Sequence, residues 1–197
     1  MHVSYMSPSE QLESVAMGQA GYFTAAQATA AGYPDSLHVY HTREGHWQKV
    51  QRGIYRLSTF PIIPHPEPII WSLWSRDREG NPQGVVSGVS ALMDYGVLER
   101  KPGPLVLMVP RSFRKNCDIP EAISLVKGDL AEHEVEQRVG YRVVTLRKAL
   151  EQAAGHPEFE MMLTRARDLP AYYAAAPTPT RGRDARSFND VINAGED

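Results

Sequence analysis

Four prolines stand close together between Phe60 and Pro68, and this stretch constrains the fold more than any other part of the sequence. Proline has no amide proton and fixes its own φ angle, so prolines at this density cannot continue a helix or a strand. The stretch is typical of a stiff linker. It predicts two domains, over residues 1–59 and 69–176, which a linker over residues 60–68 connects.

The composition fits two compact, soluble domains. Of the 197 residues, 42% are apolar, which is enough for hydrophobic cores. Apolar runs such as Leu105–Val109 are much shorter than the ~20 residues that a membrane span needs, and the N-terminus does not resemble a secretory signal. The single Cys117 cannot form an internal disulfide. We therefore expect a cytoplasmic protein without cofactors or membrane contact, and a flexible tail over residues 177–197.

The first domain shows the outline of a DNA-binding fold. Apolar spacing predicts helices over residues 10–17, 25–31 and 35–44. Two alternating segments then flank the turn at residues 51–53, which predicts a β-hairpin. Three helices followed by a hairpin form a winged helix-turn-helix, in which the third helix enters the major groove of DNA.

The third predicted helix supplies a polar face for base recognition. If Leu37 faces the core, then Tyr40, His41 and Glu44 lie on the same side of the helix. The opposite side then carries groups that can form hydrogen bonds with base edges, and one valine that can contact a thymine methyl group. The residues of that face in the predicted DNA-binding set are Ser36, His38, Val39, Thr42 and Arg43.

The hairpin and the second helix supply the predicted phosphate contacts. The chain carries 21 basic and 23 acidic residues, a net charge of −2, but Gly45 to Leu57 contains three cations and no acid. These cations are Lys49, Arg52 and Arg56. Thr24 and Gln27 form a capping box at the start of the second helix, whose amides can bind a phosphate. We therefore expect focused binding to DNA with few phosphate contacts.

The second domain is predicted to be a mixed α/β unit with a small sheet, so that the whole chain is α+β. Helical spacing appears over residues 67–76 and 87–95, after Thr145 and after Pro157. Strand patterns cover residues 105–109, 122–127, 134–138 and 141–144. A secondary basic patch follows the first of these strands and could extend the DNA footprint, contact an acidic partner or form a solvated loop; it comprises Arg111, Arg114 and Lys115.

Catalytic and metal-binding alternatives fit the sequence poorly. Ser87 is more simply a helix N-cap than a nucleophile, because no histidine lies near it in the sequence. Asp94 with Glu99 and Lys101 suggests a nuclease-type cation site, but the five-residue gap is too short for two paired strands. The spacing of three histidines places no carboxylate with them on one helix face: His38, His41 and His46. We therefore predict neither a catalytic nor a metal site.

Seven segments occur in an order that is characteristic of one family. They are Phe23–Ala28, Ala31–Tyr33, Tyr40–Trp47, Arg52–Leu57, Val86–Leu92, Val109–Arg114 and Gly140–Arg147. Together they resemble AbiEi-type antitoxins, which belong to abortive-infection, type IV toxin–antitoxin systems. The sequence departs from the family pattern at Gly88, where histidine is frequent, and at Lys148, where threonine is usual.

The resemblance implies a transcriptional regulator that represses its own operon and an antitoxin that counters a nucleotidyltransferase-like toxin encoded beside it. Its partners would be double-stranded DNA with operator repeats, bound by a monomer or a homodimer, and that toxin. By position, the resemblance assigns DNA contacts to Ser36, His38, Thr42, Arg43, Lys49, Arg52 and Arg56. Two alternatives remain, namely a toxin-binding protein that does not bind DNA and a nuclease-related enzyme.

Overall fold

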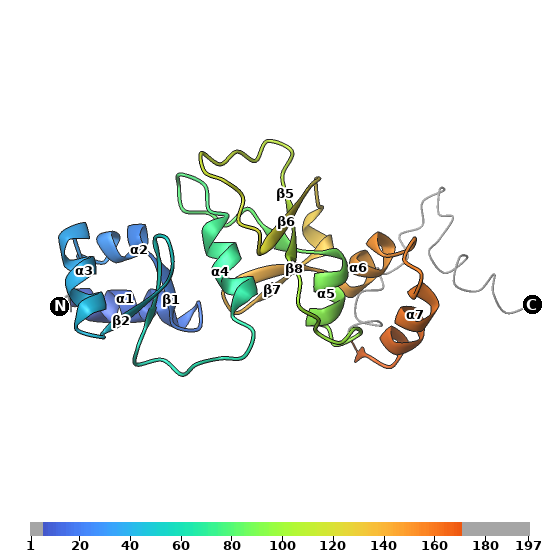
Figure 1. Ribbon diagram of the computed structural model, residues 1–197, viewed down its shortest axis with the longest axis horizontal. Helices are drawn as coiled ribbons and strands as arrows, with labels where there is room; N and C mark the ends of the chain where they lie inside the picture. Colours follow the sequence, from blue (N-terminus) through green and yellow to red (C-terminus); the bar gives the residue numbers. More distant parts are fainter. Residues whose placement is uncertain (1–5, 171–197) are drawn as a thin grey trace, which may run out of the picture.

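The computed structural model describes residues 6–170, so the predicted tail over residues 177–197 lies outside the described part. Two units follow one another along the long axis of the molecule (Figure 1). We call residues 6–57 the N-terminal unit and residues 67–170 the C-terminal unit. The α4 helix lies between the three-stranded sheet of the first unit and the larger sheet of the second (Figure 1).

The N-terminal unit contains three helices and a three-stranded antiparallel sheet with the order β1-β3-β2. Its elements are α1 (Pro8–Met17), β1 (Tyr22–Thr24), α2 (Ala25–Ala30), α3 (Asp35–Arg43), β2 (Trp47–Gln51) and β3 (Ile54–Leu57). The Thr24 hydroxyl accepts a hydrogen bond from the Gln27 amide, so the predicted capping box is present. The three helices and the hairpin confirm the predicted order of elements, whereas β1 was not predicted because three residues show no readable alternation.

The segment after β3 contains neither helix nor strand through Pro66. The predicted linker ends too late, because α4 (Glu67–Trp74) already includes Pro68 in its first turn. A proline is accepted there because the first-turn amides have no partner within the helix. The division into domains stays a prediction, since α4 joins both units through one small core cluster. That cluster comprises Tyr22, Ile54, Ile69 and Leu73.

The C-terminal unit is built on a mixed five-stranded sheet with the order β6-β5-β4-β8-β7. Its strands are β4 (Val85–Val86), β5 (Leu105–Val109), β6 (Ile123–Lys127), β7 (Val135–Arg138) and β8 (Tyr141–Val144). The β4 strand pairs antiparallel with β5 and parallel with β8, whereas β5 and β6 are parallel and β7 and β8 antiparallel. The remaining elements are α5 (Gly88–Asp94), η1 (Glu132–Glu134), α6 (Leu146–Gln152) and α7 (Phe159–Arg167).

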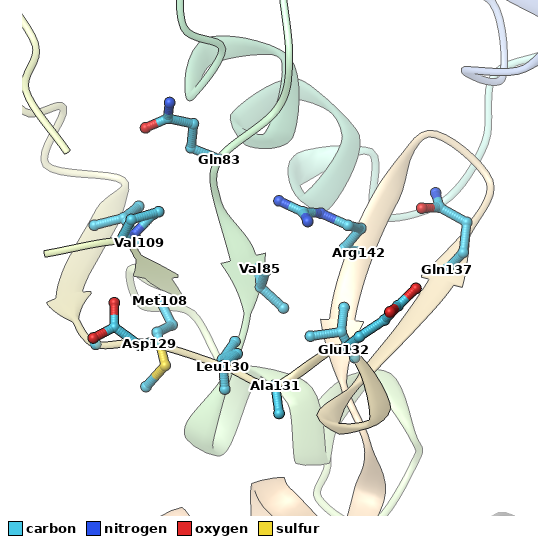
Figure 2. Close-up of a pocket in the computed structure, with 13 residues that line it drawn as sticks. Gln83, Val85, Met108, Val109, Asp129, Leu130, Ala131, Glu132, Gln137 and Arg142 are labelled. Atoms are coloured by element: carbon cyan, nitrogen blue, oxygen red, sulfur yellow. The ribbon is translucent and has the colours of Figure 1, made fainter. Parts of the chain in front are cut away.

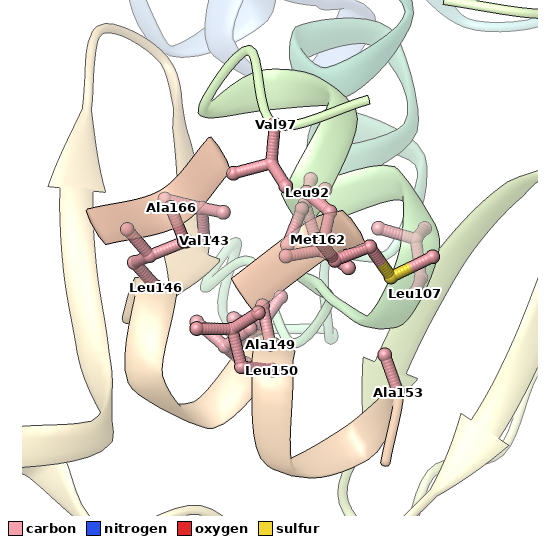
Figure 3. Close-up of a cluster of buried hydrophobic side chains, with 14 of the residues drawn as sticks. Leu92, Val97, Leu107, Val143, Leu146, Ala149, Leu150, Ala153, Met162 and Ala166 are labelled. Carbon is pink, nitrogen blue, oxygen red and sulfur yellow. The ribbon is translucent and has the colours of Figure 1, made fainter. Parts of the chain in front are cut away.

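The main hydrophobic core of the C-terminal unit lies between one face of this sheet and the helices α5, α6 and α7. Val143 and Leu107 point from the strands toward Leu92, Leu150 and Met162 from the helices (Figure 3). All five side chains are fully buried. The predicted α+β fold class is confirmed. No helix among residues 6–170 has the length and apolar character to cross a bilayer.

Candidate nucleic-acid interface

The outward face of α3 is an exposed surface of mixed polar and apolar side chains. Ser36, Val39, Tyr40 and Arg43 are exposed, and their spacing of three or four residues places them on one side of the helix. Val39 is 74% exposed and Arg43 makes only an exposed ion pair with its neighbour Glu44. This face can offer hydrogen bonds and an apolar contact to a groove of DNA.

The prediction that His38 lies on this outer face is wrong. His38 is only 4% exposed, and its ring packs against the rings of Trp47 and Tyr55. Its Nε2 atom lies 2.8 Å from the Tyr33 carbonyl oxygen, which gives the buried imidazole a hydrogen-bond partner. His38 therefore belongs to the aromatic core of the N-terminal unit.

Two side chains that the helical wheel assigned to the core are exposed instead. Leu37 is 40% exposed and Tyr40 is 45% exposed, so α3 is rotated by about one residue relative to the prediction. The prediction assumed that the most apolar residue faces inward. The sequence did contain a signal for this orientation, namely the aromatic residues Tyr33, Trp47 and Tyr55. These rings favour packing against another ring, that of His38, over packing against the Leu37 side chain.

Two of the three cations of the hairpin are exposed to solvent. Lys49 and Arg52 are exposed, whereas Arg56 is only 4% exposed. The Arg56 guanidinium donates one hydrogen bond of 2.6 Å to the Phe60 carbonyl and one of 2.8 Å to Gln48 Oε1. The prediction that Arg56 faces DNA is therefore wrong, because these bonds hold it between β2 and the segment after β3.

The predicted contacts at Thr24 and Thr42 stay predictions, but their hydroxyl groups already have partners. The Thr24 hydroxyl is engaged in the capping box, and the amide of Ala25 donates to the carbonyl of Gly53 in the hairpin turn. Thr42 Oγ1 donates to the His38 carbonyl over 2.8 Å. At both positions, a DNA contact would share or replace an existing hydrogen bond.

One residue of the predicted secondary basic patch lies beside the hairpin. Lys115 lines a groove of about 600 Å³ together with Thr24 and Arg52. Its Nζ atom donates to the Arg76 carbonyl over 2.7 Å and lies 5.4 Å from the centre of the Trp74 ring. The structure therefore brings part of the patch to the hairpin turn, although Lys115 is held by the C-terminal unit.

The other two patch residues point to solvent. Arg111 forms an exposed ion pair with Asp129 at 3.2 Å. Arg114 is exposed as well, and its guanidinium donates to the Phe113 carbonyl in the same loop. Exposed pairs of this kind contribute little to stability, so both guanidinium groups are available to a partner.

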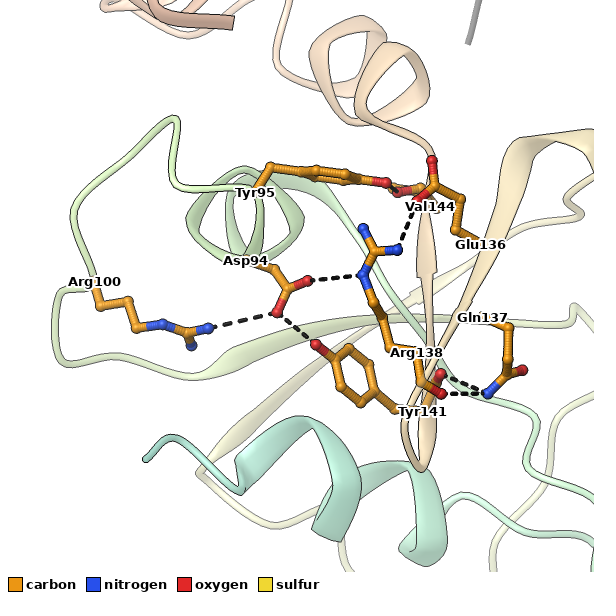
Figure 4. Close-up of polar contacts among 8 residues, drawn as sticks. All are labelled: Asp94, Tyr95, Arg100, Glu136, Gln137, Arg138, Tyr141 and Val144. Atoms are coloured by element: carbon orange, nitrogen blue, oxygen red, sulfur yellow. Dashed lines mark hydrogen bonds and ion pairs between the residues drawn. The ribbon is translucent and has the colours of Figure 1, made fainter. Parts of the chain in front are cut away.

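Asp94, which the nuclease alternative placed in a cation site, is held in a network of structural contacts. Asp94 lies among Arg100, Arg138 and Tyr141, and the Tyr141 hydroxyl donates to it over 2.7 Å (Figure 4). This network ties the β7–β8 hairpin to α5. Burial of the ring, followed by the hydrogen bond to Asp94, raises the pKa of Tyr141. Within residues 6–170, no group of three or more acidic, histidine or cysteine side chains is placed to hold a metal ion.

Ser87, the serine considered as a nucleophile, lies close to Ser90 at the start of α5. Ser87 occupies the N-cap position of α5 as predicted, but its side chain makes no capping hydrogen bond. Instead, the Gly88 amide at this end donates to Gln152 Oε1 over 2.8 Å. Ser90 Oγ accepts from the Val106 amide over 2.9 Å and so fixes α5 to β5.

The N-terminal unit should lose stability in mild acid because of His41. Burial, followed by the neighbouring His46 and His38, lowers the pKa of His41 from its ordinary value of 6.5. The folded protein then binds fewer protons than the unfolded chain below pH 6.5, so stability is fully present above that pH and declines as the pH falls toward the folded-state pKa. His41 Nδ1 lies 3.2 Å from His46 Nδ1, which also disfavours two charged rings.

We expect His41→Gln to show a smaller drop in melting temperature than the wild type between about pH 7.5 and about pH 5.5. Thermal unfolding followed by circular dichroism measures both drops. Equal drops in the two proteins would assign the acid sensitivity to other groups.

One comparison with known proteins covers the part of the chain that carries this interface. Residues 10–58 match the family model described as "Transcriptional regulator, AbiEi antitoxin". The fold is similar to that of the RV2827C protein from Mycobacterium tuberculosis, with a TM-score of 0.53 and 18% sequence identity. The alignment covers 84% of this chain and 66% of that protein, and likeness at this level of identity concerns the fold alone. No curated protein matches this chain. Over residues 10–58 the chain therefore matches the family of AbiEi-type antitoxins and transcriptional regulators, which confirms the resemblance that the motifs within this range carry.

Proposed function

We propose that this protein is a winged-helix transcriptional autorepressor and an antitoxin of a type IV toxin–antitoxin system. The observation that carries the proposal is the outward face of α3 beside the exposed cations Lys49 and Arg52, in the part of the chain that matches the family of regulators. No catalytic step is part of the proposal.

In this proposal α3 enters the major groove and the β2–β3 hairpin acts as the wing. Ser36, Val39 and Arg43 contact base edges, whereas Lys49 and Arg52 bind phosphates and set the register. Arg43 is the residue best suited to discriminate sequence, because a guanidinium can bind both acceptors of a guanine. Tyr40 joins this set because it is exposed on the same face.

The C-terminal unit is proposed to act as a separate antitoxin domain. It would counter a nucleotidyltransferase-like toxin, and the protein would bind operator repeats in its own promoter as a monomer or a homodimer. The support is the order of family motifs in this unit, including Val109–Arg114 and Gly140–Arg147.

We expect binding to a fragment of the protein's own promoter to depend steeply on salt. With two to four phosphate contacts, affinity should fall roughly 10- to 100-fold between about 50 and about 200 mM salt. Fluorescence anisotropy with the promoter fragment and a scrambled fragment measures this dependence and the preference for sequence. The absence of binding to the promoter fragment at about 50 mM salt would refute DNA binding.

The same assay tests the role of α3. Arg43→Ala should reduce the preference for the promoter over the scrambled fragment by roughly tenfold. Arg167→Ala is the matched control, because Arg167 is an exposed arginine of α7 at the opposite end of the molecule (Figure 1). Equal losses in both variants would mean that only total charge matters.

A second candidate is a toxin-binding protein that does not bind DNA. It is favoured by the exposed apolar side chains on α3, namely Leu37, Val39 and Tyr40, since such groups also occur at protein interfaces. Rescue of cells from the toxin without any binding to the promoter fragment would support this candidate over the first.

A further inference from the structure

A polar cavity of about 370 Å³ lies where the two units meet. From the N-terminal unit, Gln19 lines the cavity, and it lies in the segment between α1 and β1. Ser72 and Arg76 contribute from α4 and its end, and Arg142 from β8. The size is sufficient for a small metabolite.

The cavity is lined by two arginines and by no carboxylate. Arg76 donates to Gln19 Oε1, and Arg142 donates to the Pro82 carbonyl over 2.6 Å, so both guanidinium groups are held by neutral acceptors. Burial lowers the pKa of both groups, because each cation has lost part of its hydration. Two half-buried cations without a counter-charge favour the binding of an anion.

Two buried polar atoms at this cavity have no hydrogen-bond partner among residues 6–170. They are Ser72 Oγ and Arg76 Nε. Both atoms are almost completely covered by the protein, so they lie behind the surface of the cavity and do not contact its interior. An unpartnered buried donor is unfavourable, and the Arg76 guanidinium is therefore incompletely satisfied by the protein itself.

A second cavity differs from the cavity between the units in the charge of its lining. It has a volume of about 520 Å³ and lies on the sheet, where Arg142 and Gln137 also contribute (Figure 2). Its wall, however, includes the carboxylates of Asp129 and Glu132 (Figure 2). Its charge is therefore mixed, whereas the cavity between the units carries positive charge only.

We propose that the cavity between the units binds the oxyanion group of a small molecule, a phosphate or a carboxylate, through Arg76 and Arg142. The guanidinium groups pair with the anion. Because the walls come from both units, a bound anion would hold the N-terminal unit in one orientation. This last consequence rests on the proposed function, whereas the site itself does not.

The test uses the full chain without DNA, so that its failure is distinct from a failure of DNA binding. Inorganic phosphate and citrate are titrated by isothermal calorimetry, with sodium chloride at matched ionic strength in the reference. We expect saturable binding of at least one probe, and at least a tenfold loss of affinity in Arg76→Gln and in Arg142→Gln. Arg167→Gln, on the exposed side of α7, is the charge-matched control and should bind as the wild type does.

Binding of phosphate alone would assign a phosphorylated ligand, and binding of citrate alone would assign a carboxylate. If neither probe shows saturable heat, or if both arginine variants bind as the wild type does, the proposal is overturned.

Discussion

Replacing Arg52 by alanine should weaken binding to the promoter roughly tenfold and lower the magnitude of the salt slope by about one, while stability stays unchanged. Arg52 is exposed at the turn of the β2–β3 hairpin, where its guanidinium has no structural hydrogen bond among the described residues. The loss is therefore one phosphate contact and the counterion release that accompanies it.

Arg56, only four residues away, should respond in the opposite way. Arg56→Ala removes the hydrogen bonds to the Phe60 carbonyl and to Gln48, and leaves acceptors and space in a buried region. We expect a loss of about 2–3 kcal/mol in the free energy of unfolding, with a salt slope like that of the wild type. Urea denaturation and fluorescence anisotropy on both variants measure the contrast. A reduced salt slope in a folded Arg56→Ala variant would return Arg56 to the DNA-binding set.

Replacing Gly21 by alanine should destabilise the protein by about 2–4 kcal/mol. Gly21 has a φ of +91°, and a Cβ atom there would lie 2.5 Å from Phe60 Cβ. The change therefore adds a steric overlap to the cost of a left-handed backbone. The affected site is the contact between the start of β1 and the segment that leads to α4, so the whole N-terminal unit should be weakened.

Gly45→Ala is the matched control for this prediction. Gly45 also has a positive φ, +77°, but no atom lies within 4 Å of the position that an added methyl group would take, so only the backbone cost of about 1 kcal/mol applies. Chemical denaturation of both variants separates the two effects. Equal losses would show that Phe60 moves away from the added methyl group at little cost.

Elements with a strong local signal could be predicted from the sequence. Thr24 and Gln27 form the expected capping box, and the hairpin after Trp47 has the expected turn. The apolar run Leu105–Val109 forms a strand, and the segments on either side of Gly140 pair as an antiparallel hairpin. Each of these signals depends on residues within a few positions of one another, so no distant contact is needed to interpret it.

The rotation of α3 could not be predicted in the same way. A helical wheel gives relative directions but not the direction of the core, and the prediction chose Leu37 over His38 on hydropathy alone. In the folded chain His38 meets Trp47 and Tyr55, which come from the two strands of the hairpin. The buried position was therefore decided by the shape and polarity of partners that lie farther along the chain.

The sequence is sufficient to derive the order of the helices and strands, the hairpin and its charge, and the family that residues 10–58 match. The folded chain is needed to see that Arg56 is buried while Lys49 and Arg52 are exposed. It is also needed to see that Ser72, Arg76 and Arg142 line one cavity with Gln19. This difference arises because periodicity and capping are local interactions, whereas burial and the proximity of like charges depend on contacts between segments that are distant in the chain.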